Sequence, residues 1–191
     1  MNGVERSYWV IPGKLLAGPY PSCPDPGLAH EKLKNLLHCG IRHLIDLTEA
    51  QEVDLYGGGC LRYGELLAGL ASELGVEVEH TRISISDMST PSTRRMRLIL
   101  EAIDASLARD RPVYLHCWGG IGRTGTVVGC FLVRRGLSGE EALERIRELR
   151  RGLPAEQEPS PSTEEQRELV RTWADHDPPG SSSAPTSPAS G

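Results

Sequence analysis

Apolar residues recur along the chain with two different spacings. Short runs in which every residue or every second residue is apolar predict β-strands, whereas apolar residues three or four positions apart predict amphipathic helices. The first spacing predicts strands on both sides of the Pro12-Gly13 turn within residues 8–17, and at 41–47, 76–85 and from 113 onward. The second spacing predicts helices at residues 26–39, 61–74, 90–107, 127–133, 138–151 and 162–174.

Capping residues define the ends of several of these helices. Asp25 before a proline is typical of a helix start, Gly40 of a helix end, and the Ser138-x-x-Glu141 spacing of a capping box. Helices and strands alternate along the chain, which favours an α/β fold. We therefore predict a single domain over residues 1–176, with a central, mostly parallel or mixed sheet of about four to five strands flanked by helices.

Two segments are predicted to lack regular structure. Residues 177–191 are rich in proline and serine, and they contain too little apolar surface to offset the entropy of ordering, so we expect a disordered tail. Residues 57–59 are a run of glycine. We expect a surface loop there rather than a second phosphate-binding loop, because no strand precedes the run and no Lys-Ser/Thr pair follows it.

The overall composition limits the class of protein. The chain has 191 residues, enough for one domain with a sizeable core, and its net charge of −5 offers no basic surface for nucleic acid or anionic membranes. No apolar stretch approaches about 18 residues, and the N-terminus lacks a leader pattern. Five cysteines without a C-x-x-C pair fit a reducing compartment better than disulfides or zinc. We expect a cytoplasmic monomer without metal or cofactor.

One segment combines a strand, a glycine-rich loop and a helix start. The apolar run that begins at Val113 ends in a His-Cys pair at residues 116–117, and a helical apolar run follows at 127–133. Backbone N–H groups at a helix N-terminus, together with the helix dipole, bind anions. Glycines that accept a positive φ let the backbone curl around such an anion. Three loop residues offer that freedom: Gly119, Gly120 and Gly122.

Cys117 opens this loop, and Arg123 follows it by six positions. A helix N-terminus and a nearby guanidinium stabilise a thiolate, which is the nucleophilic form of cysteine. The guanidinium fork also matches two phosphate oxygens. None of the other four cysteines has an arginine at this spacing. The pattern indicates attack of Cys117 on phosphorus to form a cysteinyl-phosphate, and the alternative is an inert buried cysteine beside a turn.

The His-Cys-x5-Arg-Thr-Gly sequence at residues 116–125 resembles the signature loop of the protein tyrosine phosphatase superfamily. Its glycine spacing is similar to that of small dual-specificity members, including the cyclin-dependent-kinase-associated phosphatase type, and the resemblance extends over most of residues 8–174. It implies that Cys117 is the nucleophile, that Arg123 clamps the phosphate and that Thr124 donates a hydrogen bond to the leaving thiolate. The histidine of the motif would orient the loop from behind. The resemblance implies phosphate contacts with Trp118, Gly119, Gly120, Ile121, Gly122 and Arg123.

A carboxylic acid near the loop is also needed, because the departing oxygen of a phosphate ester requires a proton. Asp87 is the candidate, since it follows a predicted strand and precedes the next helix, where relatives in the superfamily carry their acid. A local turn or helix cap is the alternative role for Asp87. Asp46 and Glu49 follow an earlier strand and are expected to anchor a loop. Gln166 either positions the hydrolytic water, as a glutamine does in some relatives, or lies on a solvated helix face.

These observations predict a metal-independent phosphomonoester hydrolase of the tyrosine or dual-specificity class, acting on phosphorylated proteins and above all on phosphotyrosine. The residues between Cys117 and Arg123 are uncharged, whereas multiply charged phosphoinositides and inositol phosphates favour lysines in this loop. The net negative charge of the chain argues against RNA 5′-triphosphates as substrates. A catalytically silent phosphopeptide-binding module is the remaining alternative, and the intact Cys117, Arg123 and Asp87 argue against it.

Replacement of Asp87 by Asn tests the predicted acid. We expect turnover of alkyl and poor aryl phosphates to fall by roughly 10²–10⁴, because these leaving groups must be protonated as the bond breaks. Turnover of para-nitrophenyl phosphate should change far less, because its leaving group departs without a proton. Steady-state kcat over a series of leaving groups measures the difference. Equal losses for every leaving group would show that Asp87 is structural and would make Asp46 and Glu49 the next residues to test.

Overall fold

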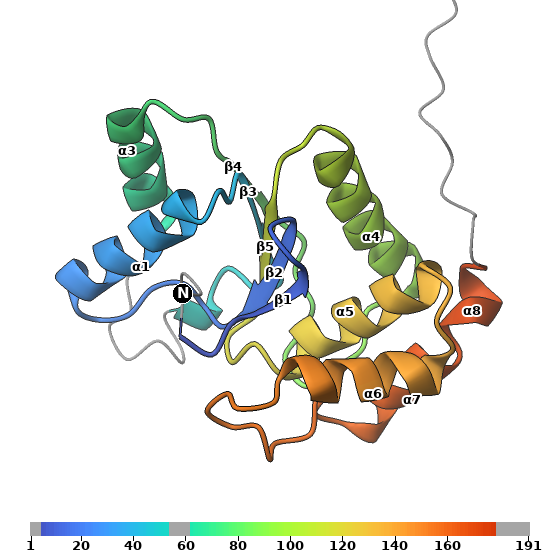
Figure 1. The fold of residues 1–191 in the computed structure, drawn as a ribbon. Helices are drawn as coiled ribbons and strands as arrows, with labels where there is room; N and C mark the ends of the chain where they lie inside the picture. Colours follow the sequence, from blue (N-terminus) through green and yellow to red (C-terminus); the bar gives the residue numbers. More distant parts are fainter. Residues whose placement is uncertain (1–4, 54–61, 179–191) are drawn as a thin grey trace, which may run out of the picture.

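Five short strands form one sheet in the computed structural model, which describes residues 5–53 and 62–178 (Figure 1). The strands are Tyr8–Ile11 (β1), Leu15–Gly18 (β2), His43–Asp46 (β3), Glu79–Arg82 (β4) and Val113–His116 (β5). Their order across the sheet is β1-β2-β5-β3-β4. β1 is antiparallel to β2, and all other neighbouring strands are parallel. The predicted α/β fold with a mixed, mostly parallel sheet is therefore confirmed.

Helices cover both faces of this sheet (Figure 1). One face carries α1 (Pro26–His38) and α3 (Gly64–Leu74), and the other carries α4 (Thr93–Ala108), α5 (Gly122–Arg134), α6 (Gly139–Leu149), α7 (Glu164–Arg171) and α8 (Trp173–His176). Successive strand residues point to opposite faces. Leu44 and Tyr114 accordingly belong to the core beneath α1 and α3, whereas Ile45 and Leu115 belong to the core beneath α4 and α5. α6 and α7 pack on α5 as an outer layer.

The predicted caps of two helices are present. The Asp25 side chain accepts a hydrogen bond from Leu28 N at 2.9 Å and so caps α1, which begins with the following proline. The Ser138 hydroxyl accepts from Glu141 N at 3.3 Å, and the Glu141 carboxylate accepts from Ser138 N at 2.8 Å. These reciprocal bonds satisfy N–H groups that a helix start would otherwise leave free.

Several element boundaries differ from those predicted, and three of the differences have a visible structural reason. β4 is shorter than residues 76–85 because it is an edge strand and pairs only with the four residues of β3. α4 is capped by Ser92 rather than Thr90, since the Ser92 hydroxyl accepts from an N–H of the first turn. The helix predicted at 162–174 is divided at Thr172, whose φ and ψ of −96° and 3° interrupt it.

Asp177, expected in the tail, belongs to the folded domain. It is 5% exposed, and its Oδ2 lies 2.5 Å from Nε of Arg134, which is itself buried and also pairs with Asp104 at 3.0 Å. Buried charges need such partners. The predictions for residues 57–59 and 179–191 lie outside the described residues. Among the helices of the described chain, none is long and apolar enough to cross a bilayer.

The Asp177→Asn substitution tests this contact. We expect the free energy of unfolding to fall by about 3 kcal/mol, the low end for breaking a buried ion pair, because Asp104 still pairs with Arg134. Urea unfolding measures the change. The matched control is Asp175→Asn, an exposed site two residues earlier, where we expect a change within about 0.5 kcal/mol. Equal stabilities of the two variants would contradict the assignment.

Candidate active site

The predicted catalytic loop connects the central strand to α5. β5 pairs with β2 on one side and with β3 on the other, and its last residue, His116, lies at the carboxyl edge of the sheet. Residues 117–121 follow, and α5 begins at Gly122. Ligands of parallel α/β sheets bind at this edge, and the N-terminus of α5 adds backbone donors. The loop therefore occupies a position suited to an anion.

Gly120 is the loop position that no other residue type fits. Its φ is +74°, and a Cβ there would lie 2.5 Å from the carbonyl carbon of Gly18. Its N–H also donates to Cys117 Sγ over 3.3 Å. A Cβ on Gly122 would lie 2.9 Å from a serine hydroxyl ahead of α7, whereas one on Gly119 would meet nothing within 4 Å. Of the three predicted turn glycines, only Gly120 has a positive φ, and packing constrains Gly122.

Cys117, at the start of the loop, and Thr124, in the first turn of α5, are both buried. Cys117 is 2% exposed and is a free thiol. The Thr124 hydroxyl is fully buried and has no hydrogen-bond partner among the described residues. An unpartnered buried hydroxyl is unfavourable. The orphaned donor fits the role that the resemblance implies for Thr124, which is to donate to a thiolate.

Arg123 is held by groups from two separate segments, one with Glu52 and one with Ile85 and Asp87. Its Nη1 and Nη2 lie 2.6 Å and 2.8 Å from the two carboxylate oxygens of Glu52. Nη1 also donates to the Ile85 carbonyl at 3.0 Å, and Nη2 lies 3.0 Å from Asp87 Oδ1. The arginine is 2% exposed. The structure thus brings together two of the predicted catalytic side chains, Arg123 and Asp87.

Glu52 is a site residue that the sequence analysis missed. Its side chain is 3% exposed, and both oxygens grip the guanidinium of Arg123, which fixes the plane of the fork. Burial lowers the pKa of Arg123, but the hydrogen bonds that Arg123 donates to Glu52 and the negative charges of Cys117 and Asp87 outweigh it and raise that pKa. Glu52 lies in a polar segment after a strand, so its only sequence signal is proximity to the carboxyl edge of the sheet.

The two alternative acids anchor loops, as expected. Asp46 is fully buried, and its carboxylate accepts from Thr48 N at 2.8 Å and pairs with Arg82 at 2.9 Å. Burial raises the pKa of Asp46, but contacts with His80 and Thr48 lower it overall, well below its ordinary value. Glu49 accepts a hydrogen bond at 3.2 Å from the serine that precedes Asp87. Asp87 itself is 53% exposed on its side chain, so its carboxylate combines access to solvent with contact to the arginine.

Hydrogen bonds behind the loop hold the histidine of the motif. His116 is fully buried, with Nδ1 3.2 Å from the Cys117 carbonyl and Nε2 2.7 Å from the Tyr63 hydroxyl. The same hydroxyl lies 2.9 Å from His80 Nε2. Burial lowers the pKa of His116, which favours the neutral imidazole. A neutral ring between a hydroxyl and the cysteine carbonyl orients the loop from behind, as the resemblance implies.

Gln166 does not lie on a solvated helix face. It is fully buried, and its Nε2 donates to the Ser89 carbonyl at 3.1 Å, in the turn that carries Asp87. The hypothesis of a solvated glutamine is therefore wrong. Gln166 precedes the apolar residues Leu169, Val170 and Trp173 by three, four and seven positions, so the helical spacing places it on the apolar face and was a sign of this burial.

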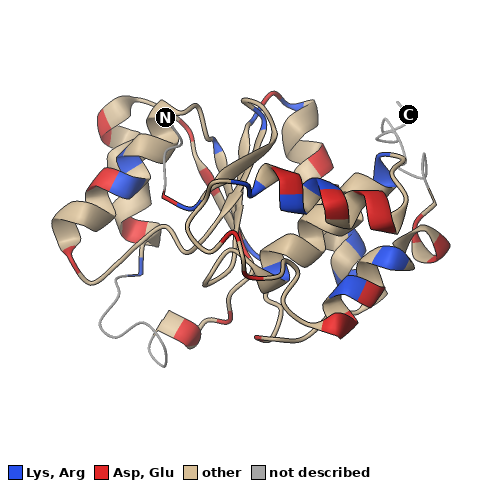
Figure 2. Cartoon of the chain, turned by 60° about the horizontal axis from the view of Figure 1, so that its bottom comes forward, with Lys and Arg blue, Asp and Glu red and all other residues tan. Residues whose placement is uncertain are grey.

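Charged residues of both signs occur together on the outer helices. Figure 2 shows acidic and basic residues interspersed along the helices. Many of these charges are paired, as in the contacts of Arg171 with Glu140 at 2.7 Å and with Glu164 at 2.5 Å. Within residues 5–53 and 62–178, no three His, Cys, Asp or Glu side chains gather as metal ligands.

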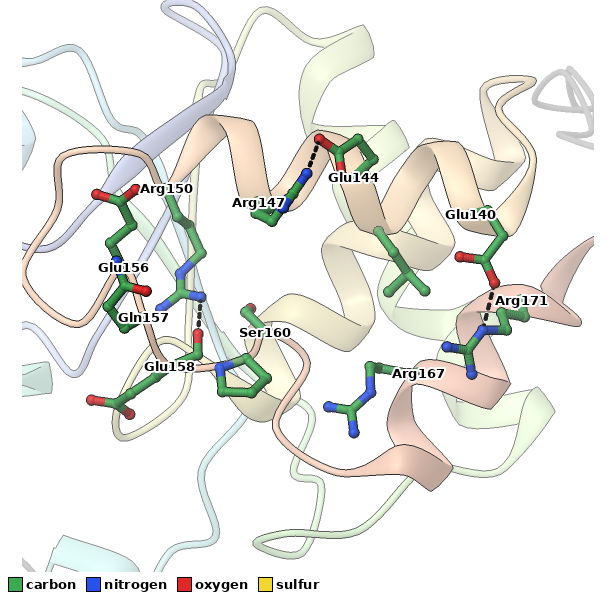
Figure 3. A pocket seen from close by; sticks show the side chains of 12 residues that line it. Glu140, Glu144, Arg147, Arg150, Glu156, Gln157, Glu158, Ser160, Arg167 and Arg171 are labelled. Atoms are coloured by element: carbon green, nitrogen blue, oxygen red, sulfur yellow. Dashed lines mark hydrogen bonds and ion pairs between the residues drawn. The ribbon is translucent and has the colours of Figure 1, made fainter.

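A cavity of about 670 Å³ lies between α6, α7 and the segment 150–160 (Figure 3). Its walls are mostly charged, and Arg147 Nη2 pairs with Glu144 Oε1 at 2.6 Å. It meets the catalytic loop through Ser160, whose hydroxyl donates to the Ile121 carbonyl at 2.8 Å. None of the predicted catalytic residues lines it, so the cavity is separate from the candidate active site.

A cysteine loop at the carboxyl edge of a mixed sheet, with a buried arginine and an adjacent acid, is the arrangement typical of the cysteine-based phosphatase class. The sequence pattern of the family described as "Polymorphic toxin system, DSP-PTPase phosphatase" matches residues 25–137. The chain belongs to this dual-specificity phosphatase family, and the resemblance seen in the sequence is confirmed.

Curated relatives show the same likeness. Human cyclin-dependent kinase inhibitor 3 is 30% identical over 122 residues, which are 63% of this chain and 52% of that protein. The Arabidopsis thaliana protein named as a phosphatidylinositol 3,4,5-trisphosphate 3-phosphatase and protein-tyrosine-phosphatase PTEN1 is 33% identical over 96 residues, 49% of this chain and 22% of that protein. The chain therefore spans about half or less of the length of these relatives.

Solved structures share the fold. A form of kinase-associated phosphatase with serine in place of the catalytic-site cysteine has a TM-score of 0.67 at 22% identity, over 88% of this chain and 92% of that one. Tk-PTP in its active form has a TM-score of 0.65 at 26% identity, over 89% of this chain and 97% of that one. PTPMT1 in complex with PI(5)P has a TM-score of 0.65 at 20% identity, over 90% of this chain and 96% of that one.

The Glu52→Gln substitution tests the grip on Arg123. The amide nitrogen cannot accept from the guanidinium, so one of the two charge-assisted hydrogen bonds is lost and the fork tilts. We expect kcat/KM to fall roughly 10- to 100-fold, with vanadate inhibition weakened to a similar extent.

The matched control for this prediction is Glu65→Gln on the exposed surface of α3, which should leave both quantities unchanged. A Glu52→Gln protein with normal vanadate affinity and only a lower melting temperature would contradict the role of Glu52 in orienting Arg123.

Proposed function

We propose that this protein hydrolyses phosphate monoesters through a covalent intermediate on Cys117. The observation that carries the proposal is the buried Arg123 guanidinium, held by Glu52 and facing Asp87, at the end of the loop that Cys117 begins. Arg123 supplies a clamp for the phosphate oxygens, Asp87 an acid and Cys117 a nucleophile. Membership of the dual-specificity phosphatase family supports the same conclusion.

In the first step the Cys117 thiolate attacks phosphorus, and the bond between phosphorus and the ester oxygen breaks. The departing oxygen takes a proton from Asp87, which leaves a cysteinyl-phosphate and a carboxylate. Arg123 and the backbone N–H groups of residues 118–123 stabilise charge on the three equatorial phosphoryl oxygens.

In the second step water attacks the phosphorus of the cysteinyl-phosphate. The Asp87 carboxylate takes a proton from this water, the bond between sulfur and phosphorus breaks, and inorganic phosphate leaves. The Thr124 hydroxyl donates a hydrogen bond to the returning Cys117 thiolate, and its lack of another partner among the described residues supports this role. No metal or cofactor takes part in either step.

The proposed substrate is a phosphorylated protein, with phosphotyrosine preferred. The loop side chains Trp118 and Ile121 are uncharged, and the remaining loop positions are glycine, so the loop adds no cation for a second phosphate. A phosphoinositide or inositol phosphate substrate is the second candidate, favoured by the likeness to PTPMT1 bound to PI(5)P. Relative kcat/KM values for phosphotyrosyl peptides and for soluble phosphoinositides decide between them. We propose a cytoplasmic monomer that binds neither nucleic acid nor membrane.

The Cys117→Ser substitution tests the covalent mechanism. We expect turnover to be abolished while inorganic phosphate still binds, because Arg123 and the backbone N–H groups remain. Mass spectrometry of acid-quenched wild-type protein should detect one phosphoryl group on Cys117.

The matched control is Cys23→Ser, because Cys23 lies outside the catalytic loop and only donates to the Asp25 carbonyl, as a serine also does. Activity of Cys117→Ser above roughly a tenth of wild type would exclude Cys117 as the nucleophile. If the wild-type protein binds phosphate but shows no turnover, the result would instead support a catalytically silent phosphopeptide-binding module.

A further inference from the structure

Gln166 lies at the junction of three segments of the candidate active site. It is fully buried in the first turn of α7. A Cβ on Gly122 would lie 3.2 Å from Gln166 Oε1 and 3.4 Å from Nε2, so the amide packs against the start of α5. Nε2 donates to the Ser89 carbonyl at 3.1 Å. One side chain therefore touches α7, the catalytic loop and the turn that carries Asp87.

The orientation of this amide is determined by its partners. Oε1 accepts from Ser162 N at 3.1 Å and from Thr163 N at 3.2 Å, and these N–H groups are donors only. The Ser89 carbonyl is an acceptor only, so the nitrogen must face it. Both lone pairs of Oε1 are used. A glutamine that orients an attacking water through its oxygen must accept a hydrogen bond from that water, and Gln166 Oε1 has no free lone pair for that purpose.

The turn that carries Asp87 is held at both ends. Ser89 N donates to the Ser86 carbonyl at 3.1 Å and closes the turn. The Ser86 hydroxyl donates to Glu49 Oε1 at 3.2 Å at one end, and Gln166 holds Ser89 at the other. Between these attachments, Met88 has a φ of +58°, which is unfavourable for a residue with a Cβ. Such a turn keeps its shape only when its ends are fixed.

We propose that Gln166 is a positioning residue that fastens the Asp87 turn to α7, and that it does not orient the hydrolytic water. Asp87 Oδ1 lies 3.0 Å from Arg123 Nη2, and this placement depends on a turn whose tip is exposed. The inference rests on the proposed function, in which Asp87 protonates the leaving group. Loss of the attachment misplaces the acid while the nucleophile and the phosphate clamp remain.

The two roles of a glutamine at this position have different kinetic signatures. A misplaced acid slows the first step and does so only for leaving groups that need a proton. A misplaced water slows the second step equally for every substrate, so the cysteinyl-phosphate accumulates and the first turnover appears as a burst.

The test is the Gln166→Glu substitution. A glutamate preserves the acceptor that caps α7, since glutamate and glutamine both serve at this position of a capping box. It replaces the Nε2 donor with an oxygen that faces the Ser89 carbonyl, so the attachment is lost. Ser86→Ala releases the other end of the turn and is a second variant that leaves the buried α7 packing intact. The matched control is Gln157→Glu, the same exchange at an exposed residue beside the cavity (Figure 3).

We expect Gln166→Glu to lower kcat/KM for alkyl and poor aryl phosphates roughly 10- to 100-fold, as a small misplacement of a catalytic group does, with little change for para-nitrophenyl phosphate and no burst. Ser86→Ala should show the same dependence on the leaving group, and Gln157→Glu should match wild type. The dependence of kcat/KM on the leaving group should resemble that of Asp87→Asn, with smaller losses.

If Gln166→Glu lowers kcat/KM equally for all leaving groups and shows a burst, the glutamine orients water and the inference is overturned. Wild-type rates for all substrates would overturn it as well. If Gln166→Glu fails to fold, Ser86→Ala decides, and an unchanged dependence on the leaving group refutes the fixed turn. A wild-type protein without phosphatase activity would overturn the proposed function itself, a result separate from any of these.

Discussion

The buried charge of Arg123 constrains the arrangement of the entire candidate site. A guanidinium that is 2% exposed requires partners for its charge and its donors, and Glu52, Asp87 and the Ile85 carbonyl supply them. These groups come from the segment after β3, from the Asp87 turn and from the chain just before that turn. Arg123 therefore ties the catalytic loop to two other loops, and the position of its guanidinium is established before any phosphate binds.

A second buried network supports the loop from the opposite side. The parallel register aligns Asp46 with His116, so an acid and an imidazole meet below the cysteine. Asp46 is neutralised by Arg82, while Tyr63 bridges His116 and His80. Fully hydrogen-bonded polar networks in a low-dielectric interior are rigid, because an alternative arrangement would leave buried groups without partners. The catalytic loop is therefore held from behind by the neutral His116 and the ion-paired Asp46, and on its other side by the contacts of Arg123.

The outer helical layer contributes to chemistry as well as to stability. α7 packs on α5 and buries Gln166, and the proposed attachment to Ser89 extends this packing to the acid. The fold is shared with a kinase-associated phosphatase and with a protein bound to a phosphoinositide. Fold alone thus leaves the substrate open, and the choice depends on side chains around the loop. Its uncharged side chains, Trp118 and Ile121, favour a substrate with a single phosphate.

The sequence by itself determined the parts of this protein that depend on neighbouring residues. The loop from Cys117 to Arg123, the capping box at Ser138 and the alternation of helices and strands all involve spacings of a few positions. The order of elements, together with the resemblance to the phosphatase superfamily, pointed to Asp87, which lies beside Arg123 in the structure. Tertiary structure decided the roles of Glu52, Asp177 and Gln166. Their partners lie 71, 43 and 77 positions away in the chain. Glu52 and Asp177 lie in polar segments, where the local pattern is the same whether a side chain is solvated or buried. The spacing of Gln166 places it on the apolar face of its helix, but nothing nearby in the chain indicates its partner. Only the folded chain brings the distant charge or carbonyl that makes the burial of each residue favourable.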